Sequence, residues 1–265
     1  MAVDGHVHFH RVFDRARFLA AAATNLRAAL DGTAAAVRGP GLLLLVENPD
    51  DDFFDRCRGA AGRNMDGWLV DPTGEACSLA LSRERDRLVL VAGRQIATRE
   101  GLEVLAVGTL KRFPRDLPFR AAVDAALEAA GIAIVPWGFG KWTRFRGALV
   151  GELVASADPS RVFLGDNGGR PAAGPEPRLF AEARARGIRI LPGSDPLPFH
   201  REATKVGRYG FYLDLEPGPA PAAALKHRLR DPAVRPRPFG RREGLVAFLR
   251  AQTAMQLRKR AGSGR

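Results

Sequence analysis

The feature that most constrains this chain is its opening segment, Val3–His10, in which His6 and His8 alternate with apolar residues. Side chains of a β-strand alternate between its two faces, so these imidazoles would point the same way, about 6–7 Å apart along the strand. Two neutral imidazoles at this spacing can share one divalent cation, and Asp4, on the same face, can orient a ligand. The alternative is a polar strand end whose histidines hold no metal.

Length and composition favour a single α/β domain. A chain of 265 residues with 46% hydrophobic residues can bury a large core. No apolar run is long enough to cross a membrane and no leader-like segment opens the chain, so we expect a cytoplasmic protein with no membrane contact. The two cysteines, Cys57 and Cys77, form no pairing motif, which argues against a disulfide scaffold or a cysteine-based zinc site.

The net charge of +12 is concentrated near the end of the chain. Residues 222–265 hold 12 of the 41 basic residues and two of the 29 acidic ones, whereas the rest is nearly neutral. We therefore expect an α/β unit over residues 1–216 and a basic helical extension over 217–265. Such an extension can bind nucleic acid or another polyanion through phosphates, or can simply be a solvated helix face. Because base-reading motifs are absent, nucleic acid is the lesser alternative.

The alternation of short apolar runs with helical segments predicts a parallel sheet with helical crossovers. Expected strands include Gly41–Glu47, Leu88–Thr98, Glu103–Val107, Ile132–Pro136, Arg161–Gly165, Ile188–Pro192 and Phe211–Leu215. Expected helices include Phe13–Leu30, Phe119–Ala130, Phe145–Ala155, Glu176–Arg186, Ala222–Leu229 and Glu243–Arg258.

Polar residues follow many of these strands. In a parallel α/β barrel the loops after the strands converge on one face, where the active site lies. We therefore expect the following residues to meet there: His6, His8, Glu47, Trp137, Lys141, Asp166, Asn167, Arg170 and Asp195.

Residues Val3–Leu215 resemble the PHP (polymerase and histidinol phosphatase) domain family. Asp4–His8 is similar to the family's opening Asp-x-His-x-His motif, and Leu191–Asp195 is similar to its Gly-Ser-Asp-x-His motif. Val91–Ile96 resembles its Gly-x-Glu motif, and Ala133–Gly140 resembles the strand that ends in His-Pro. The resemblance implies a distorted seven-stranded TIM-like barrel, with His6, His8 and Asp195 as ligands of a divalent metal, zinc or manganese, in a phosphoesterase-like hydrolase.

The chain departs from the family pattern at five ligand positions. The family's Asp-His pair falls near Glu47-Asn48, its bridging Glu on Gln95, and its two later histidines on Trp137 and Leu197. The family's full multinuclear cluster cannot form from these residues. Two imidazoles and one carboxylate remain, enough for a single metal ion with an open position. Glu47 or His200 are the candidates to complete the shell.

The expected function is therefore a metal-dependent hydrolase acting on an anionic small molecule. His6, His8 and Asp195 would hold the metal, and Asp166 or Glu47 would act as acid, base or extra ligand. The anion would be bound by a second set of residues, Lys141, Arg170, Arg201, Asn167 and Trp137. The alternative is a catalytically degenerate barrel, a pseudoenzyme without a metal, that binds a ligand or partner without turnover.

Overall fold

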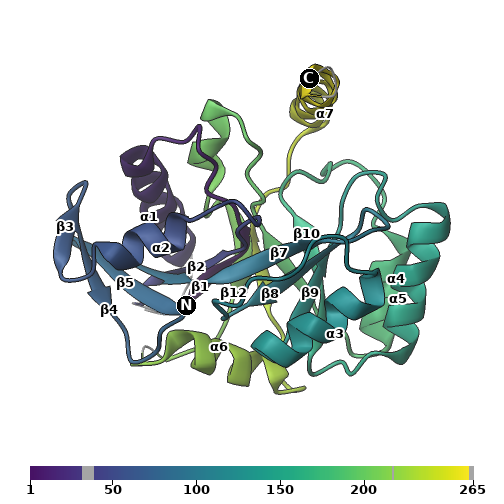
Figure 1. Ribbon diagram of the computed structural model, residues 1–265, viewed down its shortest axis with the longest axis horizontal. Coiled ribbons are helices and arrows are strands. Elements are labelled where there is room, and N and C mark those ends of the chain that lie inside the picture. Colours follow the sequence, from purple (N-terminus) through teal and green to yellow (C-terminus); the bar gives the residue numbers. More distant parts are fainter. Residues whose placement is uncertain (32–38, 217, 263–265) are drawn as a thin grey trace.

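The computed structural model describes residues 1–31, 39–216 and 218–262. Residue 217 and residues 263–265 of the predicted basic extension lie outside the described part. The strands form two sheets that enclose an apolar layer, with helices on their outer faces (Figure 1). Among the described residues, no helix has both the length and the hydropathy needed to cross a bilayer.

The first sheet contains eight strands in the order β13-β12-β1-β2-β6-β5-β4-β3. Its central strands β1, β2 and β6 are parallel, and its other strand pairs are antiparallel. The strands are β1 (Ala2–Val7), β2 (Gly41–Leu45), β3 (Arg63–Met65), β4 (Trp68–Pro72), β5 (Ser78–Arg83), β6 (Asp86–Val91), β12 (Tyr209–Tyr212) and β13 (Arg237–Gly240). Residues 217–265 thus supply one strand, β13, to this sheet.

The second sheet has the order β11-β10-β9-β8-β7. Strands β9, β10 and β11 are parallel, whereas β7 and β8 form an antiparallel hairpin whose second strand is antiparallel to β9. The strands are β7 (Gly93–Ala97), β8 (Glu103–Val107), β9 (Ala133–Pro136), β10 (Val162–Asn167) and β11 (Ile190–Gly193).

Three apolar layers hold the sheets and helices together. The run Leu42–Leu45 in β2 contributes to two of these layers, because successive side chains of a strand face opposite sides. Leu42 and Leu44 pack into the layer between the sheets, and Leu43 and Leu45 pack into the layer beneath α1 and α2. The third layer lies between the second sheet and helices α3 to α5.

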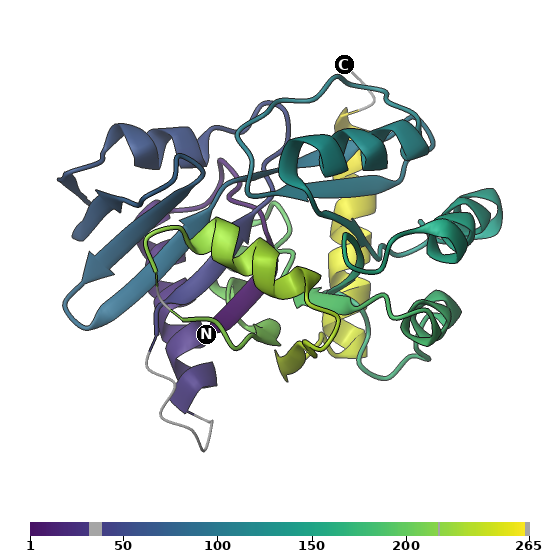
Figure 2. The same ribbon diagram turned by 90° about the horizontal axis from the view of Figure 1, so that it is seen from below.

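The helices cover the outside of the sheets, and α6 lies across the bottom of the molecule (Figure 2). The last helix, α7, stands at the opposite end in Figure 1. Their bounds are α1 (Arg15–Asp31), α2 (Phe53–Gly59), α3 (Phe119–Ala130), α4 (Arg144–Ser156), α5 (Arg178–Ala185), α6 (Pro221–Arg230) and α7 (Leu245–Gly262), with a 3-10 helix η1 (His200–Lys205).

The prediction of a closed TIM-like barrel is wrong. Neither sheet closes on itself, and no continuous ladder joins the two sheets within the described residues. Where β2 approaches β7, the pairing is a single bridge between Glu47 and Arg94. Where β1 approaches β11, the carboxylate of Asp4 accepts hydrogen bonds from Ser194 in place of a strand ladder. The antiparallel strands β5, β7 and β8 further divert the chain from a barrel of parallel strands.

Candidate metal centre

The two histidines of the opening motif lie at the end of β1, with their rings 5.0 Å apart between centroids. Their Nε2 atoms are 3.1 Å from each other, and both side chains are buried. Both imidazoles therefore lie side by side, as the sequence predicts, with His6 in β1 and His8 directly after the strand ends at Val7. His10 stacks on His8 at 5.4 Å and bonds the Pro196 carbonyl oxygen through Nε2.

Within the described part of the chain, the Asp4 carboxylate orients the loop after β11 and forms no hydrogen bond with either imidazole ring. Its fully buried carboxylate accepts hydrogen bonds from the backbone N–H groups of His6, Ser194 and Gly207, and from the Ser194 hydroxyl. Burial raises the pKa of Asp4 to about 6, and the hydrogen bonds oppose that rise. Asp4 thereby ties β1 to the segment that carries Asp195.

Two glycines allow that segment to come close. A Cβ on Gly193 would lie 2.3 Å from the backbone nitrogen of His6, and a Cβ on Gly5 would lie 2.6 Å from the Pro192 oxygen. Asp195 then adopts φ 46°, in the left-handed region that Asp tolerates better than most residues, while its N–H donates to the His6 oxygen at 2.8 Å. These contacts bring its carboxylate beside the two imidazoles.

The three side chains form a ligand set of the right size for one cation. Asp195 Oδ1 is 3.5 Å from His6 Nε2 and 3.9 Å from His8 Nε2, and the three donor atoms all lie within 4.8 Å of one another. In a tetrahedral site with metal–ligand bonds of about 2.1 Å, neighbouring ligand atoms lie about 3.4 Å apart. The donors therefore fit a tetrahedral ion with one open position, and the Asp195 side chain is 22% exposed.

The protonation states suit metal binding. Burial, together with the neighbouring His6, lowers the pKa of His8 to about 3, so its imidazole is neutral and can offer a lone pair. Burial alone would raise the pKa of Asp195, but its electrostatic interactions with His6, His8 and Lys141 outweigh burial and hold that pKa below its ordinary value. The carboxylate is therefore ionised.

Polar side chains from three neighbouring strands surround this triad. Asn167, at the end of β10, donates to Asp195 Oδ2 at 3.2 Å and to the Trp137 carbonyl oxygen at 2.8 Å. Gln95 on β7 contacts His8 and donates to Glu103 at 3.4 Å. Lys141 forms an ion pair with Glu103. Of the predicted anion binders, the structure thus brings Asn167 and Lys141 to the triad. Trp137 contributes only its backbone carbonyl oxygen to Asn167, because its side chain packs in the layer beneath α3 to α5.

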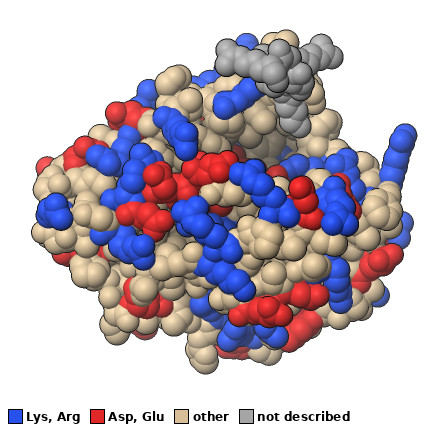
Figure 3. Space-filling view, viewed as in Figure 1, with Lys and Arg blue, Asp and Glu red and all other residues tan. Residues whose placement is uncertain are grey.

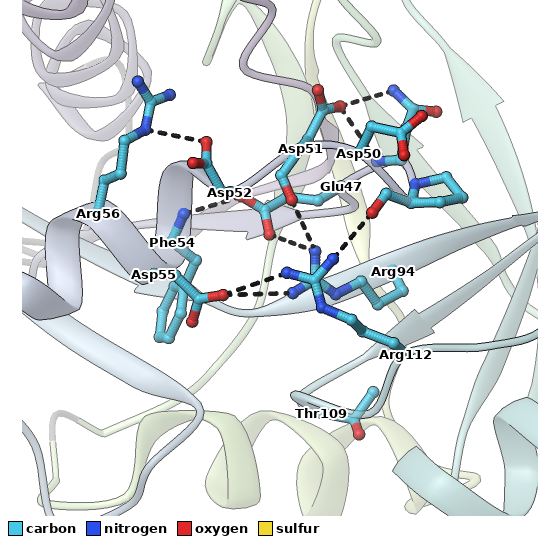
Figure 4. A network of polar contacts seen from close by, with 12 residues as sticks. Glu47, Asp50, Asp51, Asp52, Phe54, Asp55, Arg56, Arg94, Thr109 and Arg112 are labelled. Atoms are coloured by element: carbon cyan, nitrogen blue, oxygen red, sulfur yellow. Dashed lines mark hydrogen bonds and ion pairs between the residues drawn. The ribbon is translucent and has the colours of Figure 1, made fainter.

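Glu47 lies elsewhere. Its carboxylate, 3% exposed, accepts hydrogen bonds from the Phe54 backbone at 2.8 Å and from Arg94 at 2.7 Å (Figure 4). Asp55 lies 3.9 Å from the same guanidinium. Glu47 is therefore engaged in a buried ion pair that joins the start of α2 to β7.

Asp166 and Arg170 are also turned away from the triad. Asp166 precedes Asn167 on β10, so their side chains lie on opposite faces. Both Asp166 oxygens accept from Arg170, at 2.6 and 2.8 Å, and Tyr209 donates its hydroxyl proton at 2.8 Å. Burial and the adjacent Asp166 raise the pKa of Tyr209.

Arg201 is far more exposed than the triad, at 59% of its side chain, and pairs with Glu202 at 3.5 Å. It follows that the expected convergence of all strand-end residues is only partly realised. His6, His8, Asp195, Asn167 and Lys141 come together, whereas Glu47, Asp166, Arg170, Arg201 and the side chain of Trp137 do not.

Sequence reasoning missed Glu103, Arg94 and Tyr209. In the β7–β8 hairpin, Ala97 is opposite Glu103 and Leu105 is opposite Gln95. Glu103 and Gln95 therefore lie on the same face, and the alternation of the hairpin could have predicted Glu103 near the site. Arg94 and Tyr209 carry no local signal, since each acts through a partner distant in the chain.

The helix α7 extends across the end of the molecule where these strands finish. Phe248 contacts Phe139, after β9, at 5.0 Å between ring centroids, and Arg258 donates to the Pro198 oxygen, after β11, at 2.6 Å. Figure 3 shows charges of both signs around a hollow beside this helix.

No protein-family model matches the sequence, and no curated protein matches it. Among solved structures, the fold is similar to that of PsfC from Pseudomonas syringae PB-5123, with a TM-score of 0.56, 14% identity, and coverage of 90% of this chain and 91% of PsfC. A weaker likeness is to the lesion-specific endonuclease PfuEndoQ from Pyrococcus furiosus, with a TM-score of 0.48 and 10% identity over 89% of this chain and 57% of that one. At this identity the match with PsfC shows a shared fold only.

Proposed function

We propose that this protein is a metal-dependent hydrolase of PHP type that acts on an anionic small molecule such as a phosphate ester. The observation that carries the proposal is the His6, His8 and Asp195 triad, with donor atoms 3.1 to 3.9 Å apart. Three protein ligands with one open position are the arrangement of catalytic rather than structural zinc sites. A bound zinc or manganese ion would supply a hydroxide and polarise the phosphoryl group.

The surrounding residues have separable tasks in this proposal. Asn167 holds Asp195 through its Oδ2, which leaves Oδ1 facing the imidazoles. Lys141 acts electrostatically on Asp195, and it would bind the substrate anion once released from Glu103. Glu47 and Asp166 each form an ion pair with an arginine, so neither transfers a proton in the proposed reaction.

A second candidate, binding without turnover, rests on a specific observation. His6 and His8 hydrogen-bond each other directly, and the neighbouring Gln95 offers a neutral amide where a carboxylate would bind a second metal ion better. The triad would then be a hydrogen-bonded cluster in a ligand-binding protein.

Turnover assays separate the two candidates. The protein is loaded with zinc or manganese and assayed on p-nitrophenyl phosphate and a panel of phosphate monoesters, beside the His6→Ala/His8→Ala variant. We expect metal-dependent turnover that the variant loses. A compound that binds both proteins equally and is hydrolysed by neither would overturn the hydrolase proposal in favour of the binding protein.

A further inference from the structure

A basic groove lies outside the metal centre, along the outer face of β11. It has a volume of about 430 Å³ and is bordered by α5, by Tyr209 on β12 and by the segment leading into β13. A cavity of this size suits a small molecule. Five arginines line it, namely Arg170, Arg184, Arg189, Arg235 and Arg242, with Asp166 and Glu176 as the acidic residues among the lining.

Two of these arginines are buried and keep an unused hydrogen-bond donor. Arg170 is 5% exposed and Arg189 is 7% exposed. Within the described residues, Arg170 Nη1 and Arg189 Nε have no hydrogen-bond partner. Both nitrogens are themselves buried, so an anion in the groove would stabilise these guanidinium groups through their charge and not by bonding to these two atoms.

The carboxylates in the groove are already engaged. Asp166 binds Arg170 and Tyr209, and Glu176 binds both terminal nitrogens of Arg184 at 2.7 Å. That leaves three arginines, Arg189, Arg235 and Arg242, which have no carboxylate within 4.0 Å in the part of the chain that the structure describes.

The unpaired arginines contact backbone carbonyl groups. Arg189 donates to the oxygens of Asp231 and Pro159 at 2.6 and 2.8 Å, and Arg242 donates to Pro171 at 3.4 Å. Burial lowers the pKa of Arg189, and the like charge of Arg235 lowers it further. Neutral carbonyls satisfy hydrogen bonds but leave an excess of positive charge, which an anion would balance.

We propose that this groove is a binding site for a small oxyanion, a phosphate group carried by a small molecule or free phosphate, distinct from the metal centre. Several guanidinium groups facing one cavity match the multiple acceptor oxygens of phosphate. The site does not depend on the triad, because Asp166 and Asn167 face opposite sides of β10. It therefore stands whether or not the proposed hydrolase activity does.

The test is calorimetric titration of the full chain, freed of metal with EDTA and dialysed, using inorganic phosphate at constant ionic strength. Arg242→Gln and Arg235→Gln each remove one unpaired charge from the rim, and Arg189→Gln removes a buried one. Arg120→Gln, on the outer face of α3, is the matched control because it removes the same charge from an exposed position outside the groove. Circular dichroism checks that each variant is folded.

We expect one saturable site that each groove variant weakens by about tenfold. Arg120→Gln and His6→Ala/His8→Ala should bind phosphate like the unmodified protein. If Arg189→Gln fails to fold, Arg235→Gln and Arg242→Gln still show whether the groove binds phosphate. Three results would overturn the proposal. The unmodified protein could show no saturable binding up to about 20 mM phosphate. Arg120→Gln could weaken phosphate binding as much as the groove variants do, or only His6→Ala/His8→Ala could lose phosphate binding. To separate the two sources, glucose 6-phosphate is titrated in parallel, and tighter binding than phosphate indicates a phosphorylated metabolite.

Discussion

At the scale of single residues, the buried ion pair between Glu47 and Arg94 is a structural element of the fold. We expect Glu47→Gln to lower the free energy of unfolding by about 3 kcal/mol, because the buried Arg94 guanidinium loses the charge that compensates it. Urea denaturation measures the effect. Asp50→Asn is the control, since its exposed pair with Arg115 should change stability by less than about 0.5 kcal/mol. Equal effects of the two substitutions would contradict this account of Glu47.

The two cysteines offer a second test at this scale. Burial raises the pKa of Cys57 to about 12, so at pH 8 its thiolate fraction is very small and its sulfur is also shielded. Cys77 is only partly buried. We expect a Cys77→Ser variant to react with Ellman's reagent at pH 8 only when urea unfolds it, and the rate to rise with pH. Rapid labelling of the folded variant would show that Cys57 is accessible.

At the scale of strands and helices, the candidate metal centre depends on the close approach of β1 and β11. We expect Gly193→Ala to destabilise the fold by about 2 kcal/mol, since the added methyl would meet the His6 backbone nitrogen. It should also weaken zinc binding, because His6 and Asp195 would be pushed apart. Gly151→Ala on α4 is the control, with ordinary contact at 3.6 Å and a better helix former in place of glycine. A Gly193→Ala protein with unchanged zinc affinity would contradict this role.

Much of the element order could be predicted from hydrophobic periodicity. Helix α3 and strand β8 have the bounds expected from the sequence, since each is an unbroken pattern of one period. The segment Leu88–Thr98, expected as one strand, is two strands in different sheets. The chain changes sheets at Ala92, and Gly93 permits it, because a Cβ there would lie 2.6 Å from the Leu45 and Ala106 oxygens.

The candidate site was predictable where neighbouring residues share a local rule. His6 and His8 follow strand alternation, and Asp195 follows an expected strand. Two things decide whether a polar residue at a strand end faces the site. One is the face of the strand on which its side chain lies, and the other is the residue, distant in the sequence, to which it bonds. Asp166 and Asn167 are adjacent in sequence yet face opposite sides, and Glu47 is drawn to Arg94, 47 residues away. The barrel prediction failed for a similar reason. The order of strands along the sequence does not show whether a hydrogen-bonded ladder joins the two sheets.

At the scale of the whole molecule, α7 is held across the strand-end face by few contacts. Phe248 is buried against Phe139, whereas Leu249 is 55% exposed. We expect Phe248→Ala to speed amide hydrogen exchange in residues 245–258 while leaving exchange in the sheets unchanged. Leu249→Ala should leave exchange in α7 nearly unchanged. Faster exchange throughout the sheets in Phe248→Ala would instead show that α7 is part of the cooperative core.

The most direct test of the central claim is the metal content of the protein purified without a His tag or chelator, measured by inductively coupled plasma mass spectrometry beside His6→Ala/His8→Ala. The triad predicts about one zinc or manganese ion per chain, lost in the variant. No bound metal in the unmodified protein, even after soaking in zinc and manganese, would contradict the metal centre and with it the proposed hydrolase.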